Sequence, residues 1–132
     1  QESSTEASRE CRSRFSSLYI HSSRGYTRDG RIKPDLAAPG VDVYGPGISS
    51  VPGNFPYTRM TGSSIAAAHV AGAAACLYSW GYVKGNEPSI NSRSIKAYLT
   101  LGADRIASYR YPNPEWGYGM LNLYQSFLTM RD

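Results

Sequence analysis

A turn of small residues that runs directly into an apolar helix constrains this chain more than any other feature. Residues 61–72 read TGSSIAAAHVAG, and apolar residues continue as far as Trp80. The predicted helix 63–82 is therefore hydrophobic on all sides, and such a helix has to be buried. Ser64 stands where the turn becomes the helix, so the free N–H groups of the first helical turn can stabilise a developing oxyanion beside it. This position makes Ser64 a candidate nucleophile.

The same segment resembles the serine motif of the subtilisin-like serine proteases (subtilases), which reads Gly-Thr-Ser-Met-Ala-Ala-Pro-His-Val-Ala-Gly. Eight of the eleven positions in residues 62–72 match this motif, and the differences are Ser63, Ile65 and Ala68. The missing proline at Ala68 only frees a backbone N–H, which does not harm a helix. The resemblance implies that Ser64 is the nucleophile and that its backbone N–H forms part of the oxyanion hole.

Three other segments resemble the same family in the same order along the chain. They read SSRG at 22–25, KPDLAAPGV at 33–41 and GYGMLN at 117–122. Residues 17–35 look most like the clostridial spore-germination proteases and related gut-bacterial subtilases. We therefore expect residues 17–132 to be the C-terminal part of a subtilase catalytic domain. Residues 1–16 are polar and lack a hydrophobic period, so we expect an unmatched, disordered leader there.

The resemblance implies an α/β fold, namely the C-terminal portion of a subtilisin-like three-layer arrangement whose mostly parallel sheet is incomplete in this chain. The sequence predicts strands at 17–20, 41–44 and 57–60 and helices at 63–82 and 120–130. A further helix is capped by Asn91 or Ser92 and stopped by Gly102. Because a parallel sheet must be covered on both faces, the helix around Ala71 should expose an apolar face here. We expect the isolated chain to fold poorly unless the upstream part completes it.

A subtilase needs an Asp, a His and a Ser, together with an Asn side chain in the oxyanion hole. The family's Asp, His and Asn motifs lie upstream of the SSRG turn, so this chain should be inactive alone. His69 follows Ser64 by five positions on one helix, which turns the two side chains roughly 140° apart. We expect His69 to be a buried structural histidine that bonds to the neighbouring backbone. His21 is expected at a surface or edge position.

Other notable residues favour structural interpretations. Asp29, Asp35 and Asp42 are expected in turns, beside glycine or proline in the first two cases. Arg24 and Lys33 should anchor loops, and Asn122 should cap a turn. The glycines and tryptophans favour tight turns and packing: Gly62, Gly72, Trp80 and Trp116. Cys76 lies in the apolar helix and should act as a small hydrophobe. A disulfide between Cys76 and Cys11 is a minor alternative.

Composition excludes several kinds of function. The net charge is +4 and the 14 basic residues are scattered, so no nucleic-acid-binding surface is predicted. No apolar segment is long enough to span a membrane, and the polar residues 1–14 lead us to expect no signal peptide in this stretch. We predict no metal or cofactor within this chain, because no Cys/His or acidic ligand cluster is visible. The resemblance implies calcium only in the full-length domain, at upstream loops.

The sequence therefore favours a serine-type endopeptidase that acts on protein or peptide substrates and needs the missing N-terminal part of its catalytic domain as a partner. A bacterial, secreted or spore-associated location fits the resemblance. One alternative is a pseudoprotease that serves as a binding or signalling module, because only one triad member can be checked. Another is that Ser64 is merely a helix N-cap, a position that favours serine in any protein.

Overall fold

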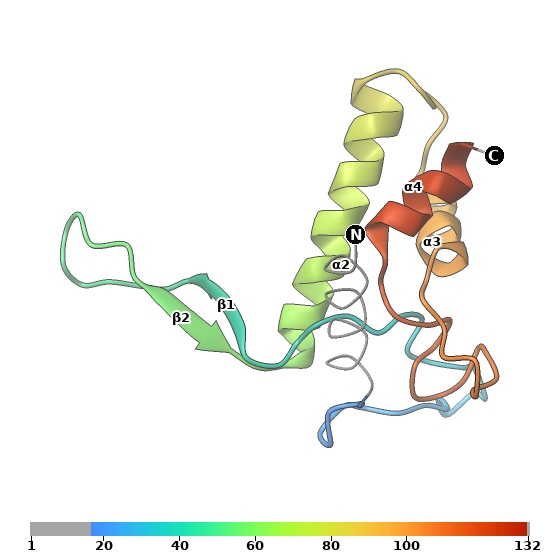
Figure 1. Ribbon diagram of the computed structural model, residues 1–132, viewed down its shortest axis with the longest axis horizontal. Coiled ribbons are helices and arrows are strands. Elements are labelled where there is room, and N and C mark those ends of the chain that lie inside the picture. Colours follow the sequence, from blue (N-terminus) through green and yellow to red (C-terminus); the bar gives the residue numbers. More distant parts are fainter. Residues whose placement is uncertain (1–16, 132) are drawn as a thin grey trace, which may run out of the picture.

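The computed structural model describes residues 17–131 of the 132-residue chain (Figure 1). The strands are β1 (Val43–Pro46) and β2 (Tyr57–Met60). The helices are α2 (Ser63–Tyr78), its π-helical continuation η1 (Ser79–Val83), α3 (Ser92–Leu101) and α4 (Leu123–Arg131). The strands form a hairpin that projects away from the helices, whereas α3 and α4 lie beside α2. The predicted leader 1–16 lies outside the described residues.

The core is small and lies between α2, α3 and α4. Ala73 and Leu77 of α2 meet Leu99 of α3 there, and Leu77 is completely buried. Val70, Ala73 and Leu77 recur at helical spacing, so they share one side of α2. The side chains that pack around this cluster are mostly aliphatic or aromatic: Leu36, Ala74, Ile95, Tyr98, Leu121, Leu123, Phe127 and Met130.

Helix α3 begins and ends where the sequence predicts. The Asn91 side chain accepts hydrogen bonds from the backbone N–H groups of Arg93 and Ser94 at 3.0 and 3.2 Å, and the Ser94 hydroxyl accepts the Asn91 N–H at 2.9 Å. This reciprocal capping box fixes the start of the helix. Gly102 is the C-cap, and a Cβ atom there would lie 2.5 Å from the backbone of Ser126 in α4. The missing side chain therefore lets α3 and α4 approach closely.

Backbone hydrogen bonds join the loop before β1 to the loop before α4. Ala37 N–H donates to Gly119 O at 3.0 Å, Leu121 N–H donates to Ala37 O at 2.8 Å, and Tyr118 N–H donates to Asp35 O at 2.9 Å. Gly117 has a φ of 60° and lies against the carbonyl groups of Pro34 and Asp35, so a side chain would not fit there. These contacts hold the two loops together although neither loop contains a regular strand.

Three predicted elements differ from the structure. Residues 17–20 form no strand; Ser22 N–H bonds to Tyr19 O in a turn, because no neighbouring strand among the described residues offers a ladder. The predicted strand 41–44 begins later, at Val43, because Asp42 has a φ of 50° that breaks the extended backbone. The predicted helix 120–130 begins at Leu123, since Met120 and Leu121 donate their N–H groups to Asp104 and Ala37.

The sheet is also smaller than expected. In the described part of the chain it has two antiparallel strands, paired from Val43 with Met60 to Pro46 with Tyr57. The mostly parallel sheet that the resemblance implies is therefore not formed among these residues. Helix and strand are both present, as an α/β fold requires, but a hairpin alone cannot cover the long helix.

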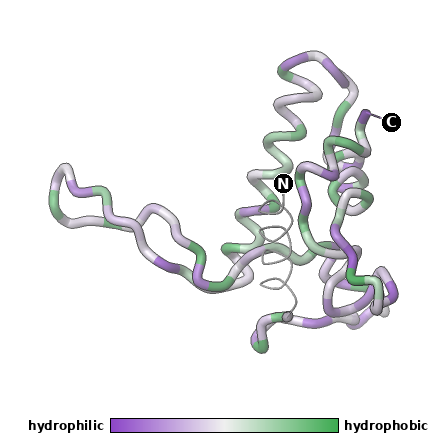
Figure 2. The backbone as a smooth tube through the Cα atoms, viewed as in Figure 1, coloured by the Kyte–Doolittle hydropathy of each residue, from purple (hydrophilic) through white to green (hydrophobic). Residues whose placement is uncertain are grey.

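The apolar helix exposes much of its surface, as the sequence predicts. Only Ala73 and Leu77 of α2 are buried. Apart from Ser63, Ser64, His69 and Tyr78, the exposed positions of the helix are small apolar or thiol residues: Ala67, Ala68, Ala71, Gly72, Ala75 and Cys76. The hairpin loop is also exposed, with Ile48 fully accessible and Phe55 at 87%. Figure 2 shows apolar and weakly polar residues along α2 and at the far end of the hairpin. Both regions carry apolar surface without cover in the described residues.

The contrast between Gly102 and Gly72 gives a stability test. Gly102→Ala should lower the free energy of unfolding by about 1–3 kcal/mol, because the new Cβ collides with the Ser126 backbone. Gly72→Ala meets no atom within 4 Å and should raise the free energy of unfolding by roughly 0.5–1 kcal/mol, since alanine favours a helix. Urea unfolding followed by circular dichroism measures both, and equal effects would contradict the packing described.

A three-residue ion network gives a test of pH dependence. Asp35 pairs with Lys33 at 2.5 Å and with Lys96 of α3 at 2.9 Å. Partial burial raises the pKa of Asp35, but the hydrogen bonds from both lysines outweigh this effect and hold the pKa below its usual value. Because the folded pKa is the lower one, the network stabilises the chain above the unfolded pKa near 4 and stops doing so as the pH falls through the folded pKa.

Asp35→Asn should therefore lower the unfolding midpoint at about pH 7, and its difference from the wild type should shrink toward about pH 2. Thermal unfolding across this range is the measurement. Asp42→Asn, at an exposed carboxylate outside the ion pairs of the described residues, is the matched control. A difference between Asp35→Asn and wild type that stays constant across the range would contradict the role of the charged pair.

Candidate functional site

Ser64 is the second residue of α2 and is exposed. The N–H groups of Ile65 and Ala66 donate to Gly62 O at 3.1 and 3.3 Å. Those of Ser63 and Ser64 have no backbone partner in the described part of the chain. No acidic side chain lies in the first turn. The helix therefore begins with free donors and an uncompensated positive dipole end, which together favour a negatively charged oxygen.

The interpretation of Ser64 as a simple helix cap is wrong. The N-cap is Gly62, which has an extended backbone and no side chain to form a cap bond. The Ser64 hydroxyl makes no hydrogen bond with another described residue, whereas a capping serine would accept one from the first turn. The Ser64 side chain is therefore exposed at the start of α2 and does not cap the helix.

Two segments far apart in the sequence meet at the turn before Ser64. Gly62 N–H donates to Gly40 O at 2.7 Å. Asp42 N–H donates to the Thr61 hydroxyl at 2.9 Å, across 19 positions of the chain. The sequence pointed to Asp42 only as a turn residue and to Thr61 not at all, because a contact over this separation leaves no local pattern.

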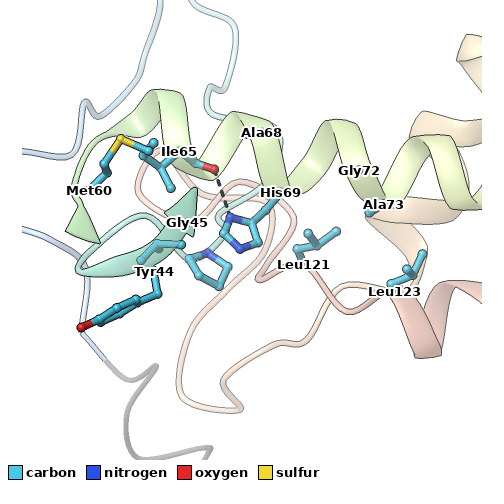
Figure 3. Close-up of a pocket in the computed structure, with 12 residues that line it drawn as sticks. Tyr44, Gly45, Met60, Ile65, Ala68, His69, Gly72, Ala73, Leu121 and Leu123 are labelled. Carbon is cyan, nitrogen blue, oxygen red and sulfur yellow. Dashed lines mark hydrogen bonds between the residues drawn. The ribbon is translucent and has the colours of Figure 1, made fainter. Parts of the chain in front are cut away.

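His69 bonds to the neighbouring backbone as predicted but is exposed, so the prediction of burial is wrong. Its Nδ1 lies 3.0 Å from Ile65 O, one turn back along α2 (Figure 3). A carbonyl oxygen only accepts, so Nδ1 is the donor in this bond. The face of α2 that carries His69 is uncovered in the described residues, which explains the exposure. With its ring held toward Ile65, His69 is not placed as a base for Ser64.

His21 is exposed and packs edge-to-face with Tyr19, with ring centroids 5.3 Å apart. This confirms the predicted surface position. No hydrogen bond joins His21 or His69 to Ser64 within residues 17–131. The described residues therefore bring the candidate nucleophile together with backbone donors but not with a base.

An apolar hollow of about 660 Å³ opens between the hairpin, α2 and the segment that leads into α4. Figure 3 shows Tyr44 and Met60 on the hairpin side and Leu121 and Leu123 on the other, with the imidazole of His69 between them. Its remaining lining residues are small or aliphatic: Pro39, Val43, Gly45, Ile65, Ala68, Gly72 and Ala73. The hollow adjoins the first turns of α2, and its walls can receive apolar side chains.

Several predicted structural roles are confirmed. Asp29 lies in a turn in which Gly30 N–H donates to Thr27 O, and hydrogen bonds from Thr27 and Arg31 lower the pKa of Asp29. Arg24 pairs with Glu115 at 2.9 Å, and Lys33 pairs with Asp35, so both cations anchor loops. The bonds of these residues are therefore formed within the loops and not with the turn 61–64 that contains Ser64.

The caps and aromatic residues also follow the prediction. Asn122 accepts the Gln125 N–H at 3.0 Å and so caps α4. Trp116 is buried, and Trp80 packs edge-to-face with Phe127. Gly72, in contrast, has no close neighbour, so its predicted close packing does not occur in the described part of the chain. Cys76 is exposed, and its alternative partner Cys11 lies outside the described residues.

The described residues limit the ligands and the membrane contacts of this chain in two ways. Within residues 17–131, no group of three or more His, Cys, Asp or Glu side chains could hold a metal ion. None of the described helices has the length and apolar character needed to cross a membrane. The calcium expectation concerns loops of a full-length domain and stays a prediction.

Known proteins resemble both the sequence and the structure. The model of the subtilase family matches residues 3–119, a range that reaches into the segment expected to be a leader. Pyrolysin from Pyrococcus furiosus is 34% identical over 120 residues, which cover 86% of this chain and 8% of pyrolysin. The subtilisin-like protease SBT4.14 from Arabidopsis thaliana is 31% identical over 96 residues, or 67% of this chain and 12% of that protein.

A solved structure agrees with the sequence matches. The CspB protease of Clostridium perfringens superposes with a TM-score of 0.76 at 37% identity, over 87% of this chain and 24% of that one. The fold is therefore subtilisin-like, and the matched proteins place the chain among the serine proteases. The chain belongs to the subtilase family. It spans only a small part of the relatives it matches.

Proposed function

We propose that this chain is the nucleophile-bearing part of a subtilisin-like serine endopeptidase, with Ser64 as the nucleophile. The supporting observation is the exposed hydroxyl of Ser64 at a helix start whose first N–H groups have no backbone partner among the described residues. In this reaction Ser64 Oγ attacks a peptide carbonyl carbon and forms an acyl-enzyme. Its proton passes to a histidine base and then to the leaving amine.

The other catalytic groups come from the remainder of the catalytic domain. That remainder supplies the histidine base, the aspartate that orients it and an asparagine side chain for the oxyanion hole. The backbone N–H of Ser64 supplies the other oxyanion donor. The chain alone is inactive, because an unassisted serine hydroxyl is a weak nucleophile. The substrate is a protein or peptide, and neither a metal nor a cofactor takes part within residues 17–131.

The exposed face of α2 is the contact surface for that remainder of the domain. Small side chains at Ala67, Ala71 and Ala75 allow a neighbouring element to approach closely, and the adjoining hollow is apolar. A mostly parallel sheet packed there completes the three-layer fold and covers the helix. Calcium belongs to loops of that full domain. We also propose a bacterial, secreted or spore-associated location; the likeness to a bacterial protease supports the bacterial part of this proposal.

Labelling with a fluorophosphonate probe tests Ser64 directly. The chain extended upstream to a complete catalytic domain should label, the isolated chain should not, and Ser64→Ala should abolish labelling. Ser63→Ala is the matched control and should label like the wild type. A folded extended protein that does not label would favour a pseudoprotease that serves as a binding module. Labelling of the isolated chain would contradict the absence of a base.

A charge on the exposed face of α2 tests the proposed contact surface. Ala71→Glu should change the stability of the isolated chain little, because position 71 is exposed there. In the complete domain it should lower the free energy of unfolding by several kcal/mol, since the carboxylate would be buried without a partner. Ala97→Glu, at an exposed position of α3, is the control. Equal unfolding midpoints of both variants in the complete domain would contradict the proposal.

A further inference from the structure

Two hydrogen bonds connect the turn 61–64, which contains Ser64, to the loop before β1. Gly62, the residue that caps α2, donates its N–H to Gly40 O at 2.7 Å. Its neighbour Thr61 accepts the Asp42 N–H on its hydroxyl at 2.9 Å. One bond uses a backbone carbonyl and the other a side chain. The two residues immediately before the first turn of α2 are thus both fixed from outside the helix.

The approach of the two segments depends on Gly40. A Cβ atom at this position would lie 2.8 Å from Gly62 O and 3.2 Å from the Ala66 side chain. Gly62 O is the acceptor for the N–H groups of Ile65 and Ala66. The loop therefore rests directly on the carbonyl group that organises the first turn of the helix, and a shift of the loop would move that turn.

Asp42 reaches Thr61 through an unusual backbone conformation. Among the described residues it alone has a positive φ without being a glycine, at 50°. The β1–β2 pairing ends at Val43 with Met60, so Asp42 and Thr61 would form the next pair of the ladder. The Gly47 N–H bond to Pro56 O marks 47/56, 45/58 and 43/60 as the hydrogen-bonded pairs, so a regular ladder would turn the Asp42 N–H away from β2. With the left-handed backbone at Asp42, this N–H instead donates to the Thr61 hydroxyl. Such uncommon conformations persist where neighbouring contacts hold them, and they cluster at functional sites.

We propose that Thr61 is a positioning residue for Ser64. By accepting the Asp42 N–H, its hydroxyl holds the turn 61–64 in one geometry and so fixes the directions of Ser64 Oγ and of the Ser64 N–H. This inference rests on the proposed function of Ser64. Preorganisation of this kind is valuable because a shift of about 1 Å at a reacting group can slow a reaction roughly a hundredfold. The hydrogen bond from the Asp42 N–H needs a hydroxyl acceptor at position 61, which serine also provides and valine lacks.

Two measurements test Thr61. In the complete catalytic domain, the amide hydrogen of Asp42 should exchange slowly, and Thr61→Val should accelerate its exchange, while Thr61→Ser should restore protection. In the complete domain, Thr61→Val should lower the maximal rate of fluorophosphonate labelling roughly tenfold or more with little change in probe affinity. Thr61→Ser should recover most of that rate. Thr58→Val in β2 is the matched control, because the Thr58 hydroxyl makes no hydrogen bond among the described residues, and it should behave like the wild type.

The outcomes separate this inference from the function on which it rests. A wild-type domain that fails to label contradicts the proposed function, and the inference falls with it. A wild-type domain that labels, with Thr61→Val labelling at the same rate, overturns only the inference. An Asp42 amide that exchanges equally fast in wild type and Thr61→Val shows that the bond does not hold the turn, and it overturns the inference as well.

Discussion

The structure depends on one mismatch: a helix that is apolar on all sides has cover on only one of them. Helix α2 buries Ala73 and Leu77 against α3 and α4, while small residues such as Ala71 and Ala75 face outward. Burial of apolar surface is the main favourable contribution to folding, so half of the helix adds little stability here. The loops around it compensate with backbone hydrogen bonds and ion pairs, including those of Asp35.

The same helix connects packing to chemistry, because the candidate site stands at its first turn. The helix start keeps its N–H groups available, since the N-cap is a glycine and no acidic residue lies nearby. Its position is set from outside by Gly40 and Asp42, whose bonds reach the residues before Ser63. At the first turn of α2 a hydroxyl group can have a fixed direction and still be exposed. A flexible loop would not fix its direction, and a buried helix interior would not leave it exposed.

Local signals in the sequence predicted much of this arrangement. The start of α2 at Ser63, the cap at Asn91 and the stop at Gly102 all follow from residues within one turn of each boundary. Features that need a distant partner could not be predicted in the same way. Residues 17–20 have strand composition but no strand beside them, and His69 has the surroundings of a buried residue but no covering layer in the described chain. The bond of Asp42 to Thr61 is likewise a product of the folded chain.

The proposed function makes completion of the fold and gain of activity a single event. In that proposal, the sheet that covers Ala71 and Ala75 comes from the same remainder of the domain as the histidine and aspartate. On the proposed function, a chain without that remainder exposes apolar surface and carries a serine without a base, so we expect it to be less stable than the complete domain and not to cleave substrate.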